Sequence, residues 1–267
     1  MNLLKRDLAP ILPEAWAAID AEATRVLKLN LAGRRLFDFD GPHGWKHAAV
    51  NTGRLVLCEE QPVEGVKAGL RHVQRLVEVR TPFVLDIMAL DEIARGRADA
   101  DLDPVIDAAM RTALFEERAI FHGWKVADID GVLPASPHEP IKVAAARDYP
   151  EALLAAQETL RKAGVEGPYA LALGPAVHEE LMAATEEGYP LLRQIGRPLI
   201  DGPLVRSPAL DGAVVVSVRG GDYEISVGQD LSIGYAAHDR DRVELYITET
   251  FTFRVLTPTA AVRLVRA

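Results

Sequence analysis

Residues 223–255 read YEISVGQDLSIGYAAHDRDRVELYITETFTFRV, and their apolar side chains recur at every second position. A period of two is typical of β-strands, so we expect strands at Tyr223–Val227, Leu231–Tyr235 and Val243–Val255. The runs Ala213–Val218 and Ala261–Val265 on either side have strand character too. Gly220-Gly221 then predicts the first hairpin turn of this region.

The preceding part of the chain has helical periodicity instead. We expect helices from Pro13 to Gly33, from Asp103-Pro104 to Phe121, from Asp148 to Gly164, and from Pro175 to Glu187 with Gly188 as the cap. The buried stripe of the second, long helix is expected to comprise Ile106, Ala109, Met110, Ala113, Leu114, Ile120 and Phe121. Runs of helices followed by runs of strands indicate an α+β fold.

The segment from Val50 to Arg75 follows neither pattern. A short strand at Arg54–Leu57 leads into a polar stretch with Glu59, Glu60, Pro62, Glu64 and Gly65. Such a segment has little to bury within its own domain. Two interpretations remain open: a mobile hairpin loop, or a segment that packs on another subunit.

Composition excludes several classes of protein. The chain has 267 residues and 30 Lys and Arg against 39 Asp and Glu, a net charge of −9, which disfavours a general nucleic-acid binder. The single cysteine, Cys58, excludes an intramolecular disulfide and a multi-cysteine zinc site. No signal-peptide core and no run of about 18 apolar residues is present, so we expect a soluble cytoplasmic protein without a membrane partner.

The sequence contains no recognisable catalytic, cofactor or metal motif. It has no G-x-S-x-G elbow, no P-loop and no G-x-G-x-x-G. His178-Glu179 lacks the second histidine of a zincin helix, and Glu116 and Glu117 lack the histidine of a ferritin-type metal helix. Of seven scattered histidines only His43 and His47 lie close together. We therefore predict no catalytic residue, cofactor or metal ligand, which favours an assembly protein over an enzyme.

Longer strings of residues resemble the encapsulin shell proteins (type 1, linocin-like), which are related to the major capsid proteins of tailed phages. The resemblance covers nearly the whole chain and is most specific near its end. The matching strings are Leu4-Lys5-Arg6 with Ala9-Pro10, Gly33-Arg34, Gly41-Pro42 with Gly44-Trp45, Glu166-Gly167-Pro168-Tyr169, Tyr189-Pro190-Leu191, Arg219-Gly220-Gly221-Asp222, Gly228 to Tyr235, and Ile247 to Phe253.

This resemblance implies a Hong-Kong-97-like capsid fold and a non-enzymatic protein that self-assembles into an icosahedral nanocompartment of 60 or more copies. The cargo would be a ferritin-like iron oxidase or a dye-decolorising peroxidase carrying a carboxy-terminal targeting peptide. The implied divisions are an amino-terminal helix and arm (1–49), an extended loop (50–75), a peripheral domain with a spine helix (76–134), an axial domain (135–204) and a return to the peripheral sheet (205–267).

The resemblance also assigns two sites. A cargo-peptide groove would comprise Leu27, Leu31, Arg34, Asp38, Asp230 and Ile233, with charges on Arg34 and Asp38 pairing with the peptide. A pore would be lined by Thr185, Glu186, Glu187, Gly188 and Tyr189, where rings of Glu attract cations such as ferrous iron. Some relatives bind flavin through a tryptophan after the strand near residue 80, but Phe83–Met88 contains none, so flavin is not expected.

Two alternatives come from other classes. Peptidase or bacteriolytic activity has been attributed to relatives of this family, but the chain lacks the nucleophile and metal motifs. A true phage capsid protein would package DNA, and the acidic composition disfavours that reading.

Overall fold

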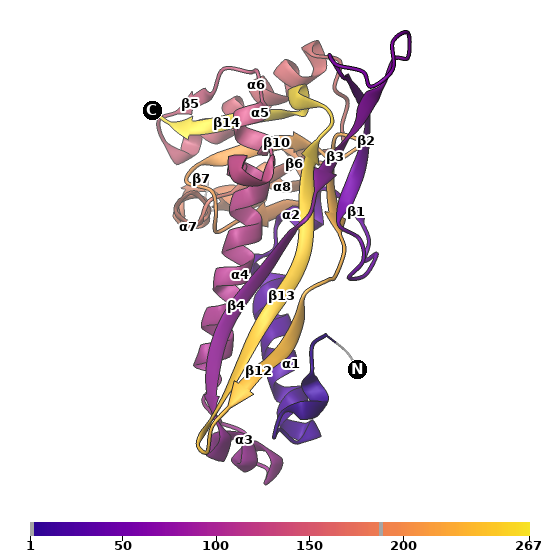
Figure 1. Cartoon of the computed structure of the whole chain (residues 1–267). Helices are drawn as coiled ribbons and strands as arrows, with labels where there is room; N and C mark the ends of the chain where they lie inside the picture. The colour runs from indigo at the N-terminus through magenta and orange to yellow at the C-terminus, as the bar shows by residue number, and fades with distance from the viewer. Residues whose placement is uncertain (1–2, 187–188) are drawn as a thin grey trace.

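The computed structural model describes residues 3–186 and 189–267, with the backbone alone at residues 186, 194, 197 and 198. Two five-stranded sheets and a projecting hairpin dominate the chain (Figure 1). The helices are α1 (Pro13–Asn30), α2 (Gly33–Leu36), α3 (Ile87–Ala94), α4 (Asp103–His122), α5 (Val132–Ala135), α6 (Tyr149–Lys162), α7 (Pro175–Ala183) and α8 (Leu191–Leu199).

The first sheet is built around one long strand, β13 (Arg242–Val255). On one side β13 pairs with β4 (Val77–Asp86); on the other it pairs first with β12 (Ser232–His238) and then with β11 (Tyr223–Val227). The short β1 (Asp38–Asp40) adds to β11 in parallel. The alternation along 223–255 thus predicts these strands correctly.

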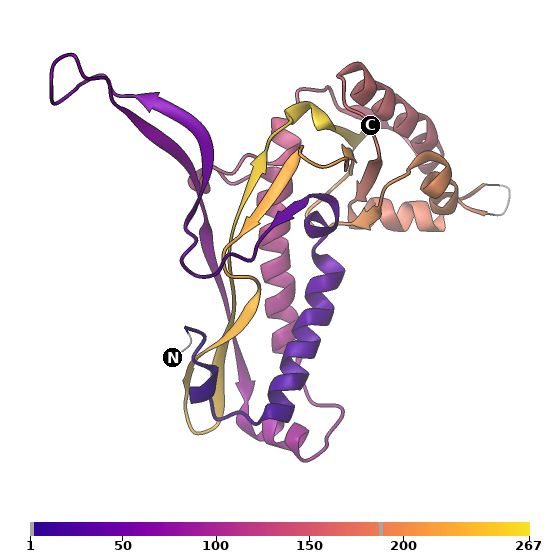
Figure 2. The same cartoon turned by 90° about the vertical axis from the view of Figure 1, so that its right-hand side faces the viewer.

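Helices α1 and α4 run side by side along this sheet (Figure 2). Their apolar faces, with β4, β12 and β13, enclose a core that includes Ile19, Val26, Phe83, Val105 and Leu245. Helix α4 begins at Asp103 with a proline in its first turn and ends before Gly123, which has φ 77°.

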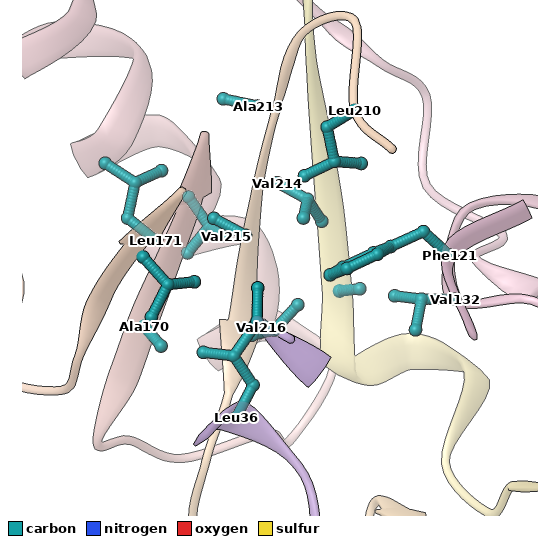
Figure 3. Packing of buried hydrophobic residues seen from close by; sticks show 14 of the residues in the cluster. Leu36, Phe121, Val132, Ala170, Leu171, Leu210, Ala213, Val214, Val215 and Val216 are labelled. Carbon is teal, nitrogen blue, oxygen red and sulfur yellow. The ribbon is translucent and has the colours of Figure 1, made fainter. Parts of the chain in front are cut away.

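The second sheet has the order β5-β14-β10-β6-β9. Its strands are β5 (Ile141–Val143), β14 (Ala261–Arg266), β10 (Ala213–Ser217), β6 (Tyr169–Leu173) and β9 (Leu204–Arg206). All residues of β6 and β10 are buried, which explains their continuous apolar sequence. Figure 3 shows Phe121 of α4 pointing toward Val214 and Leu210 at the junction of helix and sheet.

The residues of the first and second sheets differ from the predicted division of the chain, in which 205–267 returns to the first sheet. Strands β10 and β14 fall within the range expected to return to the first sheet, yet they pair with β6 and β5. The prediction of a hairpin turn at Gly220-Gly221 is wrong, because β10 and β11 belong to different sheets. The two glycines, with φ 87° and 80°, carry the chain from one sheet to the other.

Three helix predictions need correction. Gly33 does not close α1; it begins α2, where an added Cβ would lie 2.7 Å from Ile120 Cδ1, so a larger residue would have to displace that methyl group. Helix α7 ends at Ala183 rather than Glu187, because the chain turns extended at Ala184 and forms β7 (Thr185–Glu186) and β8 (Tyr189–Pro190). On α4, Ala109, Ala113, Ile120 and Phe121 are buried as expected, but Met110 is 50% exposed, and the buried stripe also includes Thr112, Glu116 and Glu117.

The segment 49–75 is a two-stranded antiparallel hairpin, which we call the arm: β2 (Ala49–Leu57) pairs with β3 (Gly69–Arg75). The arm projects from the body in both views (Figures 1 and 2). Several large apolar side chains on it are more than half exposed: Leu55, Val56, Leu57, Val63, Val66 and Leu70. A lone hairpin is marginally stable in water, so this surface is suited to contact with another chain.

No helix within the described residues is long and apolar enough to cross a membrane.

Candidate functional site

The centre of the expected groove is one guanidinium shared by three carboxylates. Arg34 of α2 contacts Glu116 of α4 at 2.8 Å, Glu249 of β13 at 2.8 Å and Asp230, in the loop before β12, at 2.7 Å. The side chains of Glu116 and Glu249 are fully buried, whereas that of Asp230 is 42% exposed. This cluster, which we call the Arg34 network, joins four separate segments of the chain.

Burial and charge oppose each other in the Arg34 network. Burial disfavours the charged form of Arg34, but the contacts with Glu116, Glu249 and Asp230 outweigh it and raise the pKa of the guanidinium. Burial also raises the pKa of Glu249, and the neighbouring Glu116 reinforces this, against the effect of Arg34. Since one oxygen of Glu249 is buried without a hydrogen-bond partner, one cation does not satisfy this cluster completely.

Next to this network, Glu117 of α4 contacts α2 and the segment after β9. Its carboxylate accepts hydrogen bonds from the Gly33 amide at 2.7 Å and from the Ser207 hydroxyl at 2.6 Å. Burial raises the pKa of Glu117 to about 8, although both hydrogen bonds act in the opposite direction. Glu117 therefore ties α4 to α2 and to the segment after β9.

The apolar residues assigned to the groove are all buried. Leu27 and Leu31 of the α1 region and Ile233 of β12 belong to one hydrophobic cluster and are only 9%, 6% and 5% exposed. In the isolated chain their side chains are therefore part of the core, and their assignment to a groove stays a prediction.

The charged residues assigned to the groove behave differently from one another. Arg34 is occupied by carboxylates of its own chain, so it offers no unpaired charge to a peptide. Asp38 accepts a hydrogen bond from the Gly221 amide at 2.6 Å and lies on the exposed strand β1. Beside it Phe39 is 40% exposed, with its ring 5.3 Å from the Arg34 guanidinium carbon. Exposed polar and aromatic groups therefore lie along β1.

The sequence analysis missed the buried acids Glu116, Glu117 and Glu249 as structural residues. The helical spacing indicates that Glu116 is buried, because Thr112, Glu116 and Ile120 follow one another at four-residue steps on the buried stripe of α4. Glu249 lies on β13 between the buried Ile247 and Phe251. An acid in an apolar pattern predicts a buried partner, here Arg34.

The expected pore loop lies at the end of α7. Thr185 and Glu186 form β7, and Tyr189, 67% exposed, begins the paired strand β8. Glu187 and Gly188 lie outside the described residues. Among the residues that are described, no group of three or more His, Cys, Asp or Glu is arranged to bind a metal ion.

Sequence comparison matches residues 1–252 to a family model described as an encapsulating protein for peroxidase. Type 1 encapsulin shell proteins of Rhodospirillum rubrum and Brevibacterium linens are 46% and 44% identical to this chain. Each alignment covers 99% of this chain, and 96% and 99% of the relative. The chain belongs to the type 1 encapsulin shell proteins. Because the relatives are named as shell proteins, the prediction of a structural protein and not an enzyme is confirmed.

Solved structures confirm the capsid fold of this encapsulin. A virus-like particle from Pyrococcus furiosus has a TM-score of 0.63 at 15% identity, covering 91% of this chain and 96% of that chain. A protein of Mycobacterium phage Bobi has a TM-score of 0.58 at 14% identity, covering 89% and 90%. At such low identity, these similarities support the fold alone.

Replacing Glu117 by Gln tests the buried acid. Because the folded-state pKa is raised from 4.5 to about 8, Glu117 contributes stability below pH 4.5 that is lost as the pH rises through about 8. Over that window the contribution falls by about 1.4 kcal/mol per pH unit. The free energy of urea unfolding should decline from about pH 5 to about pH 8 in the wild type, and less steeply in Glu117→Gln.

The matched control is Glu158→Gln on α6, where the side chain is 55% exposed and pairs with Lys162. It should leave the pH dependence of unfolding unchanged. An equal slope in wild type and Glu117→Gln would contradict the assignment of a buried, protonated carboxyl.

Proposed function

We propose that this encapsulin assembles into a closed icosahedral shell of 60 or more copies that encloses a cargo enzyme bearing a carboxy-terminal targeting peptide. The observation that carries the proposal is the arm, whose exposed apolar residues need a second copy to cover them. The family description, an encapsulating protein for peroxidase, supports a peroxidase as cargo. A ferritin-like iron oxidase is the second candidate, and the cytoplasm is the proposed location.

Electron microscopy of the purified native protein, with a denaturing gel of the same fraction, tests assembly. We expect closed particles of uniform diameter, and a second band on the gel if cargo is present. A monodisperse monomer or dimer would contradict the proposal. DNA protected from nuclease inside the particles would favour a phage-type capsid instead.

The cargo peptide is proposed to bind where the amino-terminal helix meets the first sheet. Leu27, Leu31 and Ile233 would receive its apolar side chains, while Asp38 and Asp230 present carboxylates to its cations. Arg34 serves this groove indirectly, because its 2.7 Å contact orients Asp230. Because these apolar side chains are buried, the peptide must separate them before it can contact them. The free energy needed to open this part of the core and to order the peptide therefore opposes binding.

Asp38→Lys tests the groove. The reversed charge should repel a cationic peptide and reduce the amount of co-purifying cargo about tenfold or more, as expected from the loss of about 1.4 kcal/mol of binding free energy. Particles should keep the wild-type diameter. The control, Asp99→Lys, changes a side chain that is 87% exposed and pairs with Arg97. Equal cargo in Asp38→Lys shells would remove Asp38 from the groove.

The pore is proposed to lie at Thr185–Tyr189, with Glu186 and Glu187 favouring cations. Changing both acids to Lys should slow the passage of ferrous iron into the shell without altering assembly. A metal-sensitive dye fused to the cargo measures the rate of influx. If influx is unchanged, the acids do not line the limiting pore. A shell carrying Glu78→Lys and Asp99→Lys, two exposed acids elsewhere on the chain, controls for the same change in overall charge.

A further inference from the structure

The two fully buried acids of the Arg34 network share a single cation. Glu116 of α4 and Glu249 of β13 have no exposed side-chain surface, and each contacts the Arg34 guanidinium at 2.8 Å. Within the described residues, no other Lys, Arg or His side chain pairs with either acid. Asp230, which is 42% exposed, contacts the same guanidinium at 2.7 Å. If both buried acids were ionised, at least one negative charge would be buried without a counter-charge.

The hydrogen bonds show which of the two acids is left incomplete. Both oxygens of Glu116 accept from the Arg34 guanidinium, at 2.9 Å and 2.8 Å. Glu249 accepts from Arg34 through Oε2 alone, at 2.8 Å, and its Oε1 is buried without a hydrogen-bond partner. A buried, charged oxygen without a donor is costly, and a proton on the carboxyl removes that charge. Glu249 is therefore the acid that the geometry leaves unsatisfied.

The surroundings of Glu249 favour its neutral form. The charged groups that face it are Arg34 of α2, Glu116 of α4 and Asp230 of the loop before β12. On the adjacent strand β4 its partner in register is Val79, which does not titrate. Burial raises the pKa of Glu249 well above its ordinary value, and the two neighbouring acids reinforce this effect against that of Arg34.

We propose that Glu249 carries a proton in the folded chain at neutral pH, and that this proton is the second positive charge of the Arg34 network. The protonated carboxyl donates a hydrogen bond to Glu116, which lies within reach. Loss of the proton would place two buried anions beside one guanidinium, so it would loosen the contact of α2 and α4 with β13. The consequence for the cargo groove, release of Asp230, rests on the proposed function, but the proton on Glu249 does not.

A proton held by the folded chain alone makes stability fall as the pH increases. The unfolded chain loses the Glu249 proton near pH 4.5, whereas the folded chain keeps it to a higher pH. The contribution of Glu249 is thus fully present below about pH 4.5 and is lost as the pH rises through the raised pKa of the folded state. In Glu249→Gln, whose neutral amide resembles the protonated acid in shape, this loss is absent.

Infrared spectroscopy of the purified protein at pH 7 tests for the proton directly, because a protonated carboxyl and a carboxylate absorb at separate frequencies. Glu117 is expected to contribute an acid band of its own, so the difference between wild type and Glu249→Gln isolates Glu249. We expect this difference to show the loss of one acid band. The matched control is Glu224→Gln, which removes an acid paired with Arg254 on the neighbouring strand and should leave the acid bands unchanged.

Urea unfolding gives a second readout of the same proton. Between about pH 5 and pH 7, the folding equilibrium constant of the wild type should fall by up to about tenfold per pH unit relative to that of Glu249→Gln. An acid band that persists in Glu249→Gln, or the same pH dependence of unfolding in both proteins, would overturn the proposal.

If Glu249→Gln does not fold, Glu117→Gln takes its place in the infrared measurement. An acid band that remains at pH 7 in this variant would support the proton on Glu249, and its absence would overturn it. Wild-type protein that fails to form particles would refute the proposed function but not this proposal, since both measurements need only the folded chain.

Discussion

The structure depends on one buried cation, Arg34, and on the acids that surround it. The short helix α2, the long helix α4, the strand β13 and the loop before β12 all contribute to this cluster. Two fully buried carboxylates without a cation would be strongly destabilising, on the order of 3–5 kcal/mol for loss of one partner. Conversely, burial of the Arg34 guanidinium is favourable because these acids pair with its charge. The network therefore specifies how α2 and α4 sit against the sheet more than it adds net stability.

Much of the secondary structure can be predicted from the sequence, but the pairing of strands and the burial of charged residues cannot. Period-two alternation predicts β11, β12 and β13 almost to the residue, and proline and glycine mark both ends of α4. Which strand pairs with which is a tertiary property: β10 and β11 are adjacent in sequence yet lie in different sheets. The buried stripe of α4 is predicted only in part, because two acids, Glu116 and Glu117, occupy buried positions that a pattern of apolar residues does not indicate.

Only part of the candidate site can be predicted from the sequence, because burial and pairing are tertiary properties. Residue pattern alone does not reveal the groove; the family resemblance places Leu27, Leu31 and Ile233 near one another, and the structure brings them into one cluster. What the sequence does not contain is their burial, which depends on how α1 packs against β12. It also does not reveal that Arg34 is already paired, because its partners lie 82 and more residues away along the chain.

The two strands of the arm pair with each other, so the direction of the arm depends on the contacts at its base. Within the described residues, the arm's polar contacts to the body are concentrated near its base, where Gln74 donates to Asp128 O at 2.7 Å and Arg254 donates to Asn51 O. A small change at the base is therefore amplified at the tip, where the exposed apolar residues lie. Closed symmetry repeats every such change in each copy. Residues that set the angle of the base are accordingly expected to influence assembly more strongly than their small contact area suggests.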